Sequence, residues 1–300
     1  MLPKSLSHPL RSRLAPTPSG LLHAGNALNF ILTWSITRAQ NGHLLLRIDD
    51  LDKARRRDKY LKDIFRTIDW LELDYDEGPQ GIVDFKKNWS QDLRLELYDH
   101  ALLELRNKGH LFACKCSRRD IRAISADGNY PGTCAKLSVD FDQKATAWRV
   151  HPPKALLQLP FHQLIGADRK ISFENLDAFI VKQKNAYPAY QLSSIIDDEY
   201  FKINTIIRGQ DLLDSTHYQL YLAFLMGKSG FLDTYFYHHD MMLDEQGEKL
   251  SKSKKATSLQ SWREQGRAPD ELFQKAATLL GLKGNCTNGQ MLVQMLRTIQ

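Results

Sequence analysis

Two segments near the start of the chain repeat apolar residues at the spacing of one helix face. We expect the first helix over 24–40, followed by Asn-Gly, and the second around 61–71. The leucine-rich run at 43–48 lies between them and is typical of a strand. Strands that alternate with helices predict an α/β fold with a Rossmann-like parallel sheet and functional loops at the strand ends.

The stretch at about 109–185 interrupts this alternation. It holds three of the four cysteines and short strand-like runs at 148–150 and 171–173. We interpret it as an insertion between two halves of one nucleotide-binding fold. The parallel rhythm is expected to return after it with the segments 191–196 and 203–207.

The end of the chain reads as helical. A helix is expected over about 215–226, and the residues after the lysine-rich loop suffice for two or three more helices. The expected division of the chain is a first half of the catalytic domain over 1–108, an inserted subdomain with the cysteines over 109–185, a second half over 186–256 and a helical segment over 257–300.

Composition is that of a soluble globular protein, with 42% hydrophobic and 25% charged residues. The first 13 residues lack the continuous apolar region of a signal peptide, and no apolar run is long enough to span a membrane. Four cysteines in 300 residues favour a reducing compartment. We therefore expect a cytoplasmic monomer with no membrane partner. The net charge of +6 is compatible with an RNA partner but does not by itself indicate one.

His23 stands at the expected start of the first helix, after a loop at 16–20 that reads Pro-Thr-Pro-Ser-Gly. A helix N-terminus presents free N–H groups and the positive end of the helix dipole, so it favours a phosphate. A histidine at a helix start is, taken alone, more often an ordinary surface residue. The proline- and glycine-rich loop before it favours the functional interpretation.

A second motif, Lys-Leu-Ser-Lys-Ser at 249–253, would alone be interpreted as a solvated basic loop. Together the two strings resemble the HIGH and KMSKS signatures with which class I aminoacyl-tRNA synthetases handle ATP. The resemblance implies ATP with Mg²⁺ as substrate and charge stabilisation of its phosphates. It assigns catalysis to His23, Lys249 and Lys252, and ATP binding to His23, Gly25, Asn26 and Lys252. Asn26 replaces the usual last histidine of the first signature.

Three further segments resemble glutamyl-tRNA synthetases. They read Arg-Leu-Ala-Pro-Thr-Pro-Ser-Gly at 13–20, Arg-Ile-Asp-Asp-Leu-Asp at 47–52, and Pro-Ala-Tyr-Gln-Leu, Asp-Asp and Ile-Arg-Gly-Gln-Asp within 188–211. This resemblance implies L-glutamate as the amino acid, with six binding residues: Arg13, Ala15, Thr17, Asp49, Tyr190 and Arg208.

The two arginines suit an acidic side chain, because a guanidinium can donate two parallel hydrogen bonds to a carboxylate. For Arg208 the alternative is a structural ion pair with Asp197 or Asp198. Asp49 is one methylene shorter than the glutamate that the family carries opposite the α-amino group. Its contact is therefore the weakest of the roles that the resemblance implies.

Cys114, Cys116 and Cys134 supply three thiolates, whereas structural zinc takes four ligands. The residues alone leave the fourth open among His110, Asp127, Tyr130, His151 and Cys286. They also leave open three reduced cysteines without a metal. The run Tyr-Pro-Gly-Thr-Cys at 130–134 resembles a small synthetase-like family whose zinc is completed by a tyrosine. That resemblance implies one structural Zn²⁺ bound by Cys114, Cys116, Tyr130 and Cys134.

The resemblance covers about residues 12–256, and the remaining chain is too short for an anticodon-binding region of the glutamyl-tRNA synthetase kind. The pattern resembles the glutamyl-Q tRNA(Asp) synthetase family, which implies glutamate activation and transfer to the queuosine base in the anticodon loop of tRNA(Asp). Three alternatives remain open: a truncated glutamyl-tRNA synthetase that charges a tRNA 3′ end, a small-molecule adenylate-forming ligase of the same superfamily, and a catalytically silent tRNA-binding paralogue.

Overall fold

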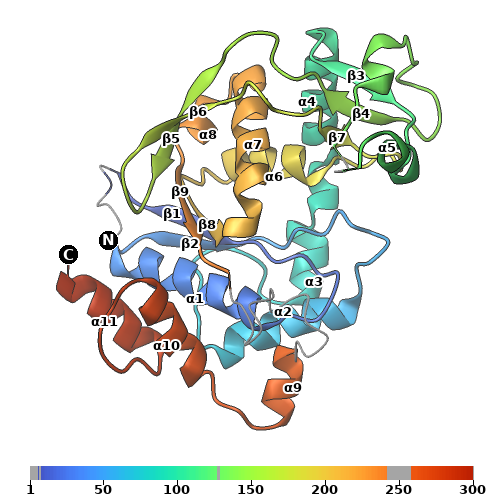
Figure 1. The fold of residues 1–300 in the computed structure, drawn as a ribbon. Coiled ribbons are helices and arrows are strands. Elements are labelled where there is room, and N and C mark those ends of the chain that lie inside the picture. The colour runs from blue at the N-terminus through green and yellow to red at the C-terminus, as the bar shows by residue number, and fades with distance from the viewer. Residues whose placement is uncertain (1–5, 7, 127–128, 242–257, 300) are drawn as a thin grey trace.

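Short parallel strands from both halves of the chain meet at the centre of the molecule (Figure 1). The computed structural model describes residues 6, 8–126, 129–241 and 258–299. Strand β1 (Arg11–Leu14) pairs in parallel with β2 (His43–Leu46), and β8 (Thr205–Gly209) pairs in parallel with β9 (Tyr235–His239). The Asn204 N–H donates to the Arg11 carbonyl at 3.1 Å, so β8 lies beside β1. The expected parallel sheet is confirmed.

Helix α1 (Ala24–Ala39) matches the first expected helix and is buried on most of its surface. It packs against β1 and β8 on one side and against helices α10 (Asp270–Leu279) and α11 (Gly289–Ile299) on the other. A helix covered on both sides is apolar around most of its circumference, as this one is. The second expected helix is α2 (Asp58–Trp70), and α9 (Leu259–Glu264) precedes the last two helices.

A second core is formed around helices α4 (Leu95–Asn107), α6 (Tyr190–Tyr200) and α7 (Leu213–Met226). The expectation that 191–196 belongs with the strands is wrong, because this run is part of α6. A short apolar run fits a buried strand and a buried helix equally well from its sequence. The expected run at 203–207 does overlap strand β8.

The segment 109–185 contributes to two sheets. At one end of the molecule it forms an antiparallel sheet beside α5 (Arg118–Ile124) (Figure 1). The strands of that sheet, in spatial order, are β3 (Leu111–Cys114), β4 (Ala147–Val150) and β7 (Ile180–Lys182). Further along the segment, β5 (Gln158–Gln163) pairs in parallel with β9, and β6 (Arg169–Ser172) pairs antiparallel to β5. This part therefore extends the central parallel sheet.

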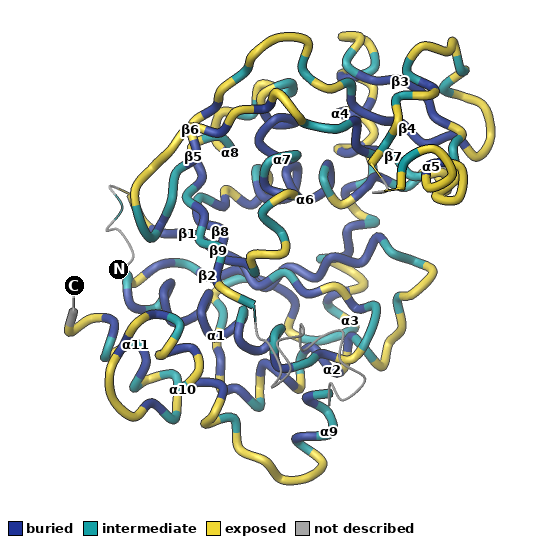
Figure 2. The backbone as a smooth tube through the Cα atoms, viewed as in Figure 1, coloured by how far each residue is buried: buried dark blue, intermediate teal, exposed yellow. Residues whose placement is uncertain are grey.

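The remaining elements are short, and Figure 2 shows that buried residues concentrate along the central strands and α1. The short elements are α3 (Ile82–Asp84), the π-helix η1 (Phe85–Trp89), the 3₁₀ helices η2 (Gln91–Arg94), η3 (Thr133–Lys136) and η4 (Gln210–Leu212), and α8 (Ser229–Leu232). No helix in the described part of the chain has the length and apolarity needed to cross a lipid bilayer.

Candidate active site

Two aspartates of helix α6 bind arginines that come from three other segments. Asp198 Oδ1 accepts from Arg13 Nε at 3.0 Å and from Arg47 Nη1 at 2.6 Å. Asp197 Oδ1 accepts from Arg94 Nε at 2.7 Å. All five side chains are buried. Each buried charge therefore has a partner, which offsets the cost of removing it from water and fixes its position.

Asp49 lies just beyond the end of β2 and is bound by Arg47. The guanidinium donates from Nε and Nη2 to the two Asp49 carboxylate oxygens at 2.7 and 3.0 Å. Burial raises the pKa of Asp49, and the carboxylates of Asp197 and Asp198 raise it further, although Arg47 opposes them. Sequence reasoning missed Arg47 as a site residue, although it begins the Arg-Ile-Asp-Asp string.

Arg208 lies near the end of β8 with 3% of its surface exposed. Its Nη1 donates to the Tyr190 hydroxyl at 3.3 Å, and its Nη2 donates to the side-chain oxygens of Thr216 and Gln219 at 2.6 and 2.7 Å. Its Nε is buried and has no hydrogen-bond partner within the described residues. The surrounding groups therefore orient this guanidinium with neutral oxygens only.

The alternative of an ion pair between Arg208 and Asp197 or Asp198 is wrong. These aspartates bind other arginines, and Arg208 has no carboxylate within ion-pair distance in the described ranges. Burial lowers the pKa of Arg208 and the nearby charge of Arg13 lowers it further, whereas Tyr190 and the charge of Asp198, beyond ion-pair distance, oppose this. His238, opposite Arg208 in the β8–β9 register, has its pKa lowered to about 3 by burial and by the Arg208 charge. His238 is therefore neutral at neutral pH and adds no second charge.

A cavity of about 600 Å³ brings three of the expected glutamate-binding residues together. Thr17 comes from the first loop, Asp49 from the end of β2 and Tyr190 from the start of α6. The Asp49 N–H donates to the Pro16 carbonyl at 2.9 Å, which holds the loop containing Ala15 against the segment after β2. Arg118 and Gln183 from the inserted segment also line it. The cavity is therefore shared between that segment and the parts of the chain on either side of it.

His23 is the N-cap residue of α1, with extended backbone. Asn26 accepts a hydrogen bond from the His23 N–H at 3.0 Å through its side-chain oxygen, so it caps the helix. A Cβ atom on Gly25 would lie 3.2 Å from His23 Cε1, so glycine permits the close approach of the ring to the helix. In a β–loop–α unit, the start of the helix lies at the same sheet edge as the carboxyl ends of the strands.

The C-terminal part of the chain returns to this helix start. Ser258 forms an antiparallel bridge with His23, and the Leu259 N–H donates to the Leu22 carbonyl at 2.8 Å. Lys249 and Lys252 lie outside the described residues. The described chain that follows, from Ser258 onward, is therefore paired with the start of α1 at His23.

The cysteines of the inserted segment lie together, as expected. The sulfur atoms of Cys114, Cys116 and Cys134 lie within 4.8 Å of one another. The Tyr130 hydroxyl oxygen is 3.6 Å from Cys114 Sγ and accepts a hydrogen bond from the Cys134 N–H at 2.8 Å. Cys286 is buried among the C-terminal helices instead. Three thiols and one phenol fit the four-ligand set of a tetrahedral metal ion, so this group could hold one.

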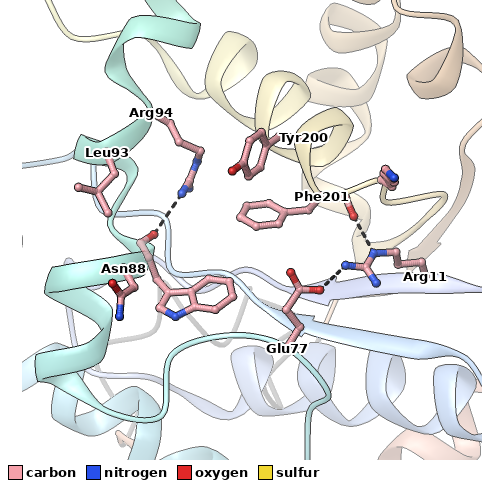
Figure 3. Close-up of a pocket in the computed structure, with 9 residues that line it drawn as sticks. Arg11, Glu77, Asn88, Leu93, Arg94, Tyr200 and Phe201 are labelled. Carbon is pink, nitrogen blue, oxygen red and sulfur yellow. Dashed lines mark hydrogen bonds and ion pairs between the residues drawn. The ribbon is translucent and has the colours of Figure 1, made fainter.

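A second cavity, of about 580 Å³, lies at the other end of α6 (Figure 3). Figure 3 shows Arg11 between the Phe201 carbonyl and Glu77, and Arg94 near Tyr200. No expected site residue lines this cavity. Arg94, which also binds Asp197, connects it to the buried charges of the first site, and sequence reasoning did not single out this arginine.

Known proteins resemble this chain over most of its length. A model of the family described as "tRNA synthetases class I (E and Q), catalytic domain" matches residues 9–295. The chain is 33% identical over 286 residues to a glutamyl-Q tRNA(Asp) synthetase of Symbiobacterium thermophilum, covering 91% of this chain and 87% of that relative. It is 32% identical over 282 residues to the glutamate–tRNA ligase 2 of Syntrophus aciditrophicus, covering 90% of this chain but only 57% of that relative.

Solved structures share the fold. A glutamate-tRNA synthetase from Elizabethkingia anophelis superposes with a TM-score of 0.73 at 18% sequence identity, covering 97% of this chain and 66% of that chain. The chain thus spans a little over half to two thirds of the glutamate–tRNA synthetases that it matches.

Proposed function

We propose a function for this chain from the premise that it belongs to the class I tRNA synthetases of the E and Q type. It activates L-glutamate with ATP. It then transfers the glutamyl group to the queuosine base in the anticodon loop of tRNA(Asp). The observation that carries the choice of glutamate is Arg208. This buried guanidinium is held by neutral oxygens and has no carboxylate partner among the described residues. An acidic side chain supplies the missing charge.

In this proposal the glutamate side-chain carboxylate binds Arg208, with Arg13 and the Tyr190 hydroxyl beside it. The α-amino group faces Asp49, whose carboxylate is oriented by Arg47. Thr17 lines the cavity that Asp49 and Tyr190 also line, and Ala15 precedes it in the same loop. Arg13 is fixed by Asp198, so it contributes its charge without having to reorganise.

The first step is in-line attack of a glutamate α-carboxylate oxygen on the α-phosphorus of ATP. The bond to the bridging oxygen of the β-phosphate breaks, which gives glutamyl-adenylate and pyrophosphate. His23, with Gly25 and Asn26 at the start of α1, is proposed to bind the phosphates, and Lys249 and Lys252 to stabilise the leaving pyrophosphate. Mg²⁺ that accompanies ATP neutralises the phosphate charges.

The second step is attack of a hydroxyl of the queuosine cyclopentene ring on the adenylate carbonyl, which releases AMP and a proton. Catalysis here depends on positioning rather than on a protein nucleophile. Support for this target comes from the relatives. The chain is 33% identical over 286 residues to one protein with the glutamyl-Q name and 31% identical over 292 residues to another. The inserted segment, which supplies one cavity wall, is the proposed side of approach for the RNA.

We further propose that the cysteine group binds one structural Zn²⁺ through Cys114, Cys116, Cys134 and the Tyr130 oxygen. The distances among these four donors support the set. Thiolate-rich four-ligand sites are characteristic of structural zinc. Bound there, the ion would cross-link the end of β3 to the chain around η3.

Mapping the glutamylated position tests the proposed target. Radiolabelled glutamate is incubated with ATP, the protein and tRNA(Asp), and nuclease fragments are then analysed. Label is expected in the anticodon-loop fragment of queuosine-containing tRNA(Asp), and none in the matched transcript that lacks the modification. Label at the 3′-terminal adenosine of either RNA would instead establish the truncated glutamyl-tRNA synthetase. Glutamate-dependent ATP–pyrophosphate exchange without RNA checks the first step separately.

A further inference from the structure

Arg149 is a buried arginine of the inserted segment that has no carboxylate partner among the described residues. It lies on β4 with 7% of its surface exposed. Its Nη1 donates to the Ala178 carbonyl at 2.8 Å, and its Nε is buried without a hydrogen-bond partner. In the part of the chain that the structure describes, it forms no ion pair. The glutamyl-transfer reaction, as proposed above, gives this residue no task.

The Arg149 guanidinium lies against Tyr130, one of the four proposed metal ligands. Its Cζ atom lies 4.0 Å from the centre of the Tyr130 ring. The hydroxyl oxygen of Tyr130, which is the proposed ligand atom, lies 3.6 Å from Cys114 Sγ. The positive charge of Arg149 therefore stands against the face of a residue whose oxygen belongs to the four-donor set.

A buried guanidinium is costly unless a negative group compensates it. Arg13, Arg47 and Arg94 are compensated by aspartates. Asp177 lines the same cavity as Arg149 and Tyr130, but it forms no ion pair with Arg149 in the described part of the chain. The cysteine group beside Tyr130 consists of thiols, which are neutral. Metal binding removes the thiol protons, and a divalent ion with three thiolate ligands carries a net negative charge. In the metal-bound form, the negative charge of the centre therefore compensates the positive charge of Arg149.

We propose that Arg149 is the charge partner of a metal centre formed by Cys114, Cys116, Cys134 and Tyr130. It is a positioning residue: it holds the Tyr130 ring by stacking, and its charge strengthens the binding of a divalent, thiophilic ion such as Zn²⁺. This inference rests on the proposed metal site and is independent of the glutamyl-transfer reaction.

The test is zinc affinity, measured on the full chain by competition with a chromophoric chelator. Arg149→Met removes the charge but keeps an unbranched side chain, and it is expected to weaken zinc binding about 10- to 100-fold. Arg149→Lys keeps the charge and is expected to retain most of the affinity.

The matched control is Arg106→Met. Arg106 also lies over an aromatic ring of β4, with its Cζ 5.6 Å from the Trp148 ring centre, but it is paired with Asp142 at 3.1 Å. This control variant is expected to bind zinc like the wild type. Unchanged affinity in Arg149→Met, or equal loss in Arg149→Met and Arg149→Lys, would overturn the role of the charge.

Thermal unfolding of the zinc-loaded and zinc-free proteins gives a second readout that a merely structural role would not produce. Arg149→Met is expected to lower the melting temperature of the zinc-loaded protein and to leave that of the zinc-free protein unchanged or higher, because it removes an uncompensated buried charge. Equal destabilisation of both forms would assign Arg149 to packing alone and overturn the proposal. If the wild type binds no zinc, the metal site fails as well, whereas glutamate-dependent exchange would still test the enzyme separately.

Discussion

The catalytic domain and the inserted segment both bury arginines, but the charges of these arginines are compensated differently. In the catalytic domain, Arg13, Arg47 and Arg94 are bound by the two aspartates of α6. Arg208 of the catalytic domain and Arg149 of the inserted segment hydrogen-bond only to neutral groups. The first kind of arginine is held in place by an aspartate, and Arg13 is the one of these that is also proposed to face the substrate carboxylate. The second kind marks where an anionic ligand or centre belongs.

This difference separates effects on stability from effects on binding. Removing one member of a buried ion pair leaves the other charge unpaired, so the folded state is strongly destabilised. Removing a buried guanidinium that forms no ion pair leaves no unpaired carboxylate behind, so the free energy of unfolding changes little. The substitution instead lowers the affinity for the anionic ligand.

The largest expected effect follows from Arg208→Met. The catalytic efficiency kcat/KM for glutamate in ATP–pyrophosphate exchange is expected to fall about a thousandfold, because the substrate carboxylate is then buried without a partner. ATP binding should change little, and Arg208→Lys should not restore activity, since an ammonium does not reproduce the guanidinium geometry. Arg11→Met is a suitable control, because Arg11 pairs with Glu77 at the other cavity. Parallel loss of ATP affinity in Arg208→Met would show that this residue supports the fold instead.

The reverse pattern is expected for Arg47→Met. This change leaves Asp49 and Asp198 buried with less compensation, so the free energy of unfolding should fall by about 3 kcal/mol. Denaturant titration measures it, with Arg208→Met as the comparison that should remain close to the wild type. If the two variants lose equal stability, the distinction between the two kinds of arginine does not hold.

A smaller effect is expected from Cys134→Ser in the inserted segment. The variant should lose bound zinc, and its melting temperature should fall by about 5 °C, because the loop around η3 loses its cross-link. RNA-free exchange with glutamate should stay within about threefold of the wild type, because the cysteines lie outside the cavity that holds Asp49 and Tyr190. Zinc content is measured by elemental analysis. A collapse of exchange would show that the two regions are not separable.

The smallest effect concerns the pH dependence of glutamate binding. Burial is the main cause that raises the pKa of Asp49 above its ordinary value of 3.8. As the pH falls, the Asp49 carboxylate therefore becomes protonated at a higher pH than an exposed aspartate does. Because the proposed contact with the ammonium needs the charged form, KM for glutamate should rise severalfold as the pH falls toward that pKa. Asp49→Asn should show a high KM that does not change with pH in this range. A wild-type KM that stays constant down to the ordinary aspartate range would contradict the role of Asp49.

The sequence predicted what local strings encode. Helix α1, the cysteine group and the joint position of Tyr190 and Arg208 agree with the motifs that carry them. The ion-pair partners of the buried arginines could not be predicted from the sequence, because partners such as Arg94 and Asp197 come from segments far apart in the chain. The pairing of β5 with β9 is also non-local. Because of it, part of the segment that we expected to be an insertion belongs to the central parallel sheet.

The most direct test of the proposed role of Arg208 is calorimetric titration of the wild-type protein with L-glutamate and with L-glutamine. The two ligands have nearly the same shape and differ in the charge of the side-chain terminus. We predict that glutamate binds at least about 100-fold more tightly, since only a carboxylate compensates the buried guanidinium. Equal affinity for the two amino acids, or tighter binding of glutamine, would contradict it.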